Sequence, residues 1–230
     1  ATLLGFGVAE PPSTLRSDEP AAEHTQTSDA KSDWTKMVGS WKSTEFGGEG
    51  KVSIAEDLIQ LAAGDPFTGV TWKGNVIREN YEIELEARRT EGSDFFCALT
   101  FPVGKSHVCF VLGGWGGGVI GISSVDGYDA SENSTTGFRD FKNGQWYKVR
   151  ARVTDENIVC WIDDEEAVEQ PREGHEFDIR FEMDPSIPLG IASFESKSEL
   201  RKLRVRSLTA RDTESKEVRE TGSKEDRERE

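Results

Sequence analysis

The alternation of apolar and polar residues with a period of two, from Lys51 to Leu208, limits the possible folds of this chain more than any other feature. Gly, Asp, Asn or Pro bounds nearly every alternating segment, and no stretch of about a dozen residues sustains the 3.6-residue period of a helix. The pattern predicts an all-β core of two antiparallel sheets packed face to face, a jelly-roll β-sandwich, because the strands are too many for one open twisted sheet. The expected strands are 51–54, 57–62, 67–72, 79–89, 94–101, 107–112, 118–125, 145–154, 157–162, 177–182, 188–195 and 200–208.

Three short polar segments are expected to reverse the chain between neighbouring strands. The sequence "PVGKS" at 102–106 joins two apolar runs, and "DENI" at 155–158 and "DDEE" at 163–166 are similar. Gly, Asp and Asn favour such turns because they tolerate the required backbone conformations. Antiparallel hairpins are therefore expected at these positions.

Composition divides the chain into three parts. Residues 1–33 are expected to be a signal-peptide remnant and flexible leader, 34–208 the sandwich domain, and 209–230 a charged tail, since both ends lack the apolar residues needed for a core. The first residues, "ATLLGFGVAEPP", resemble the end of a trimmed secretory signal peptide, with an unstructured terminus as the alternative. This similarity favours an extracytoplasmic location.

Charge and cysteine content exclude several kinds of protein. Acidic residues outnumber basic ones 43 to 28, and the net charge of -15 would repel the phosphates of a nucleic acid. No apolar run approaches the roughly 20 residues that a membrane span requires. Three cysteines, Cys97, Cys109 and Cys160, lie in strand-like runs without metal-binding spacing, so we expect buried free thiols.

A glycine-rich stretch, "FVLGGWGGGVIGIS" at 110–123, contains the pattern G-x-G-x-x-G. A dinucleotide site would need a helix to begin there, whereas the β-like run "VIGISSV" follows. Glycine also removes side chains from one face of a strand, which favours the floor of a groove with Trp115 standing clear as a platform for a sugar ring. The alternative is a bulge that curves the sheet while Trp115 fills the core.

The segment "ENYEIELEAR" places Glu82, Glu84 and Glu86 on one face of a strand. Alternating glutamates also occur in the acidic sites of laminarinase-type glycoside hydrolases, where carboxylates act as nucleophile and acid. However, 146–153 and 202–206 present Lys and Arg with the same period. We therefore favour cross-strand ion pairs on a solvated face over a catalytic site.

Several ordered segments resemble the 3-keto-disaccharide hydrolase family, which has a concanavalin-A-like jelly-roll fold. The similarity covers about 34–208, and the order of the segments carries it more than any single motif. The segments are "NYEIELEARRTEGSDFF", "GVIGISSVDG", "NGQWYKVRARVTDENIVCWIDDEEAV" and "PLGIASFESKSELRKLRVRSL".

The resemblance implies cleavage of glycosides that are oxidised at C3 of the sugar. The ketone acidifies the C2 proton, so one general base can start elimination of the C1 leaving group while a donor or a divalent metal stabilises the enolate. A non-catalytic carbohydrate-binding or adhesion module is the alternative, because Phe194-Glu195 stands where members often have His-Gly. With the resemblance, the catalytic candidates are Asp126 and Glu195, and His107 is added because it begins a core strand. The saccharide-binding candidates are Trp115 from the glycine-rich stretch, Arg139 from the polar loop at 123–141, and Asp94 and Trp161, which the resemblance places at the rim of the groove.

Overall fold

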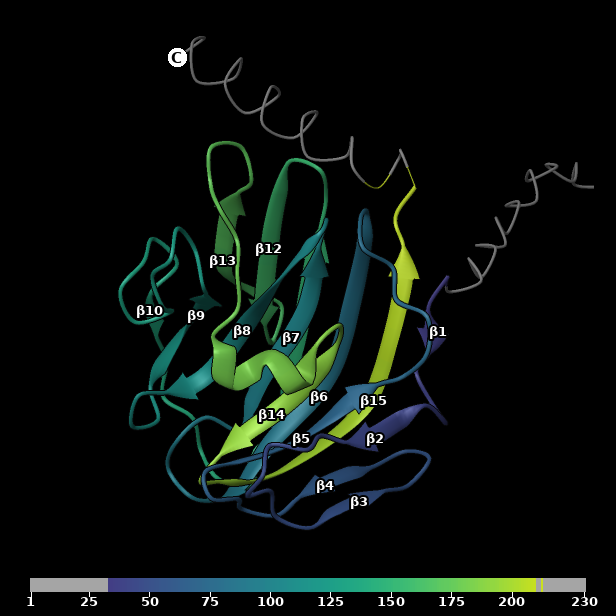
Figure 1. The fold of residues 1–230 in the computed structure, drawn as a ribbon, viewed down its shortest axis with the longest axis vertical. Helices are drawn as coiled ribbons and strands as arrows, with labels where there is room; N and C mark the ends of the chain where they lie inside the picture. Colours follow the sequence, from purple (N-terminus) through teal and green to yellow (C-terminus); the bar gives the residue numbers. More distant parts are fainter. Residues whose placement is uncertain (1–32, 210–211, 213–230) are drawn as a thin grey trace, which may run out of the picture. The chain divides into compact units, whose positions relative to one another are not determined.

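The computed structural model describes residues 33–209 and residue 212. These residues form a sandwich of two antiparallel sheets, which confirms the expected all-β jelly-roll class (Figure 1). The expected leader at 1–33 and tail at 209–230 lie almost entirely outside the described residues. Within the described part, no helix is long and apolar enough to cross a membrane.

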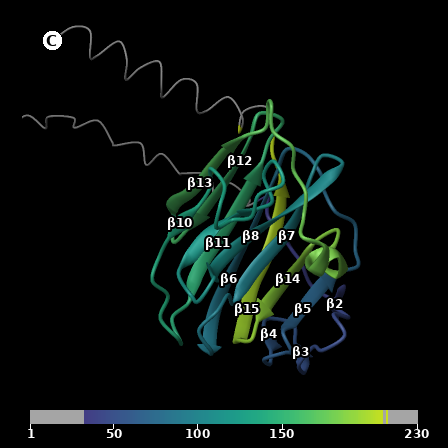
Figure 2. The same ribbon diagram turned by 60° about the vertical axis from the view of Figure 1, so that its left-hand side comes forward.

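The strands divide between two sheets, here called sheet A and sheet B, which form the two layers in Figure 2. Sheet A runs in the spatial order β13 (Glu165–Pro171), β12 (Asn157–Ile162), β11 (Tyr147–Val153), β6 (Tyr81–Glu91), β15 (Lys197–Ser207), β4 (Ile59–Leu61) and β3 (Val52–Ile54), and β1 (Thr35–Lys36) also pairs with β15. Sheet B runs β10 (Gly137–Phe138), β9 (Val119–Ser123), β8 (Ser106–Gly114), β7 (Cys97–Val103), β14 (Gly190–Phe194), β5 (Phe67–Trp72) and β2 (Trp41–Ser43).

Most of the expected strands are present. The strands at 67–72 and 157–162 coincide with β5 and β12, and the three expected reversals lie between β7 and β8, β11 and β12, and β12 and β13. The strand expected at 177–182 is wrong: Phe177 makes an isolated bridge to Val125, and the 3-10 helix η1 (Phe181–Ser186) follows. The pattern also failed to predict β1, β2, β10 and β13.

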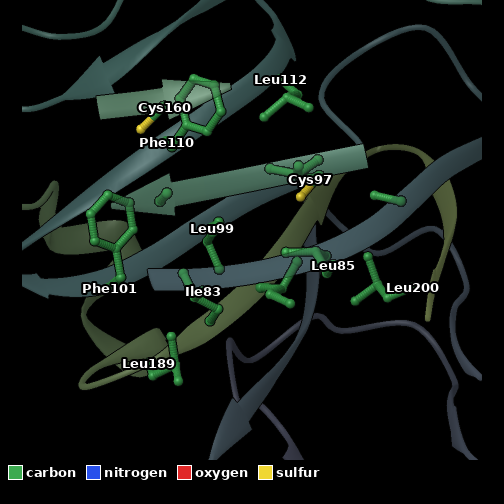
Figure 3. Packing of buried hydrophobic residues seen from close by; sticks show 14 of the residues in the cluster. Ile83, Leu85, Cys97, Leu99, Phe101, Phe110, Leu112, Cys160, Leu189 and Leu200 are labelled. Atoms are coloured by element: carbon green, nitrogen blue, oxygen red, sulfur yellow. The ribbon is translucent and has the colours of Figure 1, made fainter. Parts of the chain in front are cut away.

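The core lies between the two sheets and is made by one side of each strand. Ile83 and Leu85 of β6 face Leu99 of β7 and Phe110 of β8, and each of these is at most 1% exposed (Figure 3). Full burial of one such side chain stabilises the fold by about 1.5–3 kcal/mol. The alternate residues of the same strands face outward, so each sheet also has an outer face that is turned away from the core.

The three cysteines are buried and unbonded, as expected. Cys97 and Cys160 belong to the core between the sheets, whereas Cys109 lies on the outer face of sheet B. Burial raises the pKa of the Cys109 thiol to about 12, so it stays protonated and behaves as a small apolar side chain.

Candidate functional site

Small side chains cross the outer face of sheet B in one row. Hydrogen-bonded pairing places Gly69 of β5 opposite Ala192 of β14, Ala192 opposite Ala98 of β7, and Ala98 opposite Val111 of β8. Val111 in turn pairs with Gly121 of β9. Because neighbouring strands lie about 4.8 Å apart, such a row makes a shallow trough across the sheet.

A pocket of about 430 Å³ occupies this trough. The helix η1 lies over the outer side of β5 and β14 and closes one side of it, with Met183 in the lining (Figure 2). The volume is within the usual range for small-molecule sites. The pocket is lined by Pro66, Phe67, Asp94, Phe95, Ala98, Cys109, Val111, Trp115, Ser123, Arg180, Glu182, Met183 and Phe194.

Three phenylalanines form the aromatic wall of the pocket. The ring centroids of Phe67 and Phe194 are 5.2 Å apart, and Phe95 lies 5.6 Å from Phe194 and 6.2 Å from Phe67. These separations are typical of favourable aromatic packing. The wall is rigid because each ring supports the other two.

Trp115 stands at the rim, in the turn between β8 and β9. Its backbone is left-handed, with a φ of 50°, and the residue is 47% exposed. Among the described residues the indole has no hydrogen-bond partner and no ring partner. Asp94 fixes this turn, because its Oδ2 accepts a hydrogen bond of 2.9 Å from the Gly116 N–H while its Oδ1 accepts one of 2.7 Å from the Phe95 N–H.

The glycine-rich stretch has a different role from the expected groove floor. None of its glycines lines the pocket, and those at 116–118 form the turn that carries Trp115. Gly117 lets this turn approach the neighbouring loop, since a Cβ there would lie 2.3 Å from the Ser93 carbonyl oxygen. Gly121 belongs to the row of small residues, but the carbonyl oxygens of Ala130 and Thr135 cover it. The expectation that Trp115 stands clear of the core is confirmed.

A network of charged groups lies at another part of the lining. Arg180 donates hydrogen bonds from Nη2 to Glu182 Oε1 at 2.9 Å and from Nη1 to the Asp129 carboxylate. Ser123 Oγ donates to the other Asp129 oxygen at 2.7 Å. The hydrogen bond from Arg180 holds the pKa of Glu182 below its ordinary value, so the carboxylate is charged at neutral pH.

The pocket does not fit a divalent metal ion. Its two carboxylates, those of Asp94 and Glu182, already accept hydrogen bonds from backbone N–H groups and from Arg180. Within the described residues there is no group of three or more His, Cys, Asp or Glu side chains that could hold a metal. Hard cations require several oxygen ligands that are free to coordinate.

The three candidate acid–base residues lie outside the pocket lining. Asp126 accepts hydrogen bonds from the Glu176 N–H at 2.8 Å and shares one of 2.7 Å with His175 Nδ1, and these contacts lower its pKa. His107 lies at the start of β8, where burial and then the nearby Arg78 lower its pKa. Glu195 is exposed beyond the end of β14, next to Phe194. Their catalytic roles stay predictions.

Of the four candidate saccharide-binding residues, the pocket brings together Trp115 and Asp94. Trp161 lies in β12 on the outer face of sheet A, and its ring centroid is 4.1 Å from the guanidinium carbon of Arg150. Arg139 follows β10 and forms ion pairs with the turn between β12 and β13, at 2.9 Å to Asp163. Neither Trp161 nor Arg139 lines the pocket.

The expected cross-strand ion pairs of the alternating glutamates are confirmed on the outer face of sheet A, but the expected solvated face is wrong for Glu82 and Glu84, which are 0% and 8% exposed. Glu82 of β6 pairs with Arg152 of β11 and Arg206 of β15, at 2.7 and 2.6 Å. Glu84 likewise pairs with one residue of β11 and one of β15, whereas both partners of Glu86 lie in β15. We call these three glutamates and their partners the charge ladder. Tryptophans stack on arginines of this face, with Trp34 on Arg204 and Arg206, Trp146 on Arg88 and Arg201, and Trp161 on Arg150 and Arg152.

Sequence reasoning missed much of the pocket. Ala98, Cys109 and Val111 carry one available signal, because each is smaller than the core residues that flank it in β7 and β8. Arg180 and Glu182 could not be found this way, since they lie in a segment that alternates like a strand. Their position depends on η1 folding back over sheet B.

No protein-family model matches the chain, and no curated protein matches it. Among solved structures, a carbohydrate-binding module of Bacillus subtilis is 11% identical, covers 76% of this chain and 96% of its own, and has a TM-score of 0.42. Domain 4 of an extracellular arabinanase from Geobacillus stearothermophilus, in complex with arabinotriose, is 14% identical over 75% of this chain and 85% of its own, with a TM-score of 0.47.

A third structure comes from work on endo-acting O-glycanases of the human gut microbiota. It is 13% identical, covers 76% of this chain and 98% of its own, and has a TM-score of 0.49. At these identities the likeness concerns the fold alone.

Proposed function

We propose that this domain binds a saccharide in the pocket of sheet B, with the indole of Trp115 stacked on the sugar ring. The observation that carries this proposal is a half-exposed indole at the rim of a 430 Å³ pocket, without a ring or hydrogen-bond partner among the described residues. An indole offers a flat apolar surface that matches the C–H face of a sugar, together with one N–H donor for a hydroxyl. Asp94 holds the platform in place.

The support for this role comes from rigidity as well as composition. The Trp115 turn is tied to Asp94, and the facing wall consists of three packed phenylalanine rings. A preformed site loses little entropy on binding, which favours affinity for a small ligand. The outer face of sheet A is a weaker candidate, because stacked arginines cover its tryptophans.

A glycan array followed by titration calorimetry tests this function. We expect Trp115→Ala to weaken binding of the best glycan about 10-fold or more, which corresponds to the loss of one stacked aromatic contact. The matched control is Phe138→Ala, because Phe138 is an aromatic residue that is 79% exposed and lies outside the pocket lining. Equal affinities of the two variants would contradict the proposal.

A second candidate function is elimination from a 3-keto-glycoside, which the presence of two carboxylates in one pocket favours. Glu182 would accept the C2 proton, and the C1–O bond would then break with its electron pair going to the aglycone oxygen, which takes a proton from water as it leaves, while a C1–C2 double bond forms next to the ketone. Incubation with 3-keto-glucosides, followed by measurement of the released aglycone, tests this activity. We expect Glu182→Gln to abolish release if the carboxylate is the base, whereas binding without release would leave the domain a binding module.

We also propose that the protein acts outside the cytoplasm. The support is the similarity of residues 1–9 to the end of a signal peptide. Fractionation of the source cells, with detection of the protein in each fraction, tests this location.

A further inference from the structure

The polar groups of the pocket are largely occupied by one another. Ser123 donates to Asp129, Arg180 bridges Asp129 and Glu182, and Asp94 accepts two backbone N–H groups. A saccharide that entered deeply would bring several hydroxyl groups, and each would need a partner to offset the loss of water. The charged network offers few free donors or acceptors for that purpose.

The floor of the pocket is apolar. Ala98, Cys109 and Val111 provide it, and the aromatic wall and Met183 stand around it. The Cys109 thiol is protonated because burial raises its pKa to about 12. Water in such a space makes poor hydrogen bonds, so an apolar group that replaces it is favoured.

The charges around the pocket select against anions. Two carboxylates, Asp94 and Glu182, line it together with one cation, Arg180, whose charge is already matched by Glu182 and Asp129. The net charge of the lining groups is therefore negative. A neutral ligand complements this surface better than a uronic acid, a sulfated sugar or a fatty acid.

We infer that the ligand is a neutral glycoside with an apolar aglycone, whose sugar stacks on Trp115 at the rim while the aglycone lies on Ala98, Cys109 and Val111. This inference rests on the proposed saccharide function and adds the second half of the ligand. The two halves of the pocket divide the recognition: the exposed indole, with its free N–H donor, meets the sugar at the rim, and the apolar floor meets the aglycone.

Matched glycosides separate the two halves. The probes are methyl and phenyl β-D-glucopyranoside, the corresponding galactopyranosides, phenyl β-D-glucuronide, and phenol alone, each titrated calorimetrically against the full chain. We expect the phenyl glycoside to bind about 30-fold more tightly than the methyl glycoside of the same sugar, from burial of one aromatic ring. The glucuronide is expected to bind about fivefold more weakly than the phenyl glucoside at low salt, with a smaller difference at high salt.

Variants of the floor assign the preference to this pocket. Val111→Thr keeps the side-chain shape and adds a hydroxyl, so we expect the preference for phenyl over methyl to fall about fivefold. Ala98→Leu fills the floor and should remove the preference. Val38→Thr is the matched control, since Val38 is 46% exposed and lies outside the pocket lining.

Other outcomes would overturn the inference in distinguishable ways. Equal affinities for phenyl and methyl glycosides would refute the apolar aglycone and leave saccharide binding intact. The same holds if no probe binds while the array identifies a bound glycan. Phenol that binds as tightly as the phenyl glycosides would refute both proposals, because the sugar would then contribute nothing.

Discussion

The replacement Glu82→Gln tests how the charge ladder stabilises the sandwich. The Glu82 side chain is fully buried, and its two oxygens accept hydrogen bonds of 2.7 Å from Arg152 Nε and Arg206 Nε. A glutamine amide can accept a hydrogen bond from one arginine, but its NH₂ group would face the donors of the other. Removal of one partner from a buried ion pair costs about 3–5 kcal/mol, and we expect the lower end because both arginines keep 22% exposure.

The same substitution at Glu86 is the matched comparison within the same strand. Burial alone would raise the pKa of Glu86, but hydrogen bonds from Lys202 and Arg201 hold it below the ordinary value. The Glu86 side chain is 20% exposed and Lys202 is 63% exposed, so solvent screens this pair. We expect Glu86→Gln to cost about 0.5–1 kcal/mol.

Urea unfolding and thermal unfolding, both followed by circular dichroism, measure how far each variant lowers the unfolding free energy and the Tm. A cost of about 3 kcal/mol lowers the Tm by about 6–12 °C in a domain of this size, against about 1–4 °C for the Glu86 variant. The slope of unfolding free energy against urea concentration should stay unchanged, which would show that the folded and unfolded states of each variant are as compact as those of the unchanged protein. Equal losses in the two variants would refute the argument that burial sets the strength of the ladder.

Three further predictions follow from particular contacts. Gly117→Ala is expected to reduce both Tm and saccharide affinity, because its Cβ would lie 2.3 Å from the Ser93 carbonyl oxygen. The control is Gly116→Ala, whose Cβ would meet nothing within 4 Å, so only the positive φ of 88° destabilises it, by about 1 kcal/mol. Because folding lowers the pKa of Glu86, its charged form stabilises the protein fully above about pH 4.5, and this stabilisation is lost as the pH falls through the folded pKa. The Tm should therefore fall less between about pH 5 and 3 in Glu86→Gln than in the unchanged protein. Asp126→Asn is expected to leave affinity for the best glycan unchanged in calorimetry, since Asp126 lies outside the pocket lining, and a loss of 10-fold would show that the site extends to it.

Local patterns were sufficient to predict most of the sandwich. Alternation in β6 and β11 identified both strands to within two residues at each end, because successive side chains of a strand point to opposite faces of the sheet. It failed at 177–182, where the residues alternate in the same way but Phe181 is 78% exposed on η1. Tertiary packing against sheet B decides the conformation there, and no local pattern encodes it.

The candidate site was predictable only in part for the same reason. Trp115 could be found because the residues next to it are glycines, whose lack of side chains predicts that the indole stands free of its sequence neighbours. The floor combines Ala98 and Val111, which meet only through the pairing of β7 with β8. Arg180 comes from a third segment, far along the chain. A site built from such distant segments requires the sheet order, which the sequence pattern does not provide.

A crystal structure of the protein with its best-binding glycoside tests the central claim most directly. The account predicts a sugar ring stacked on Trp115, with the aglycone on Ala98 and Val111. Ligand bound elsewhere, such as on the charge ladder of sheet A, with the sheet B pocket filled by solvent, would contradict it.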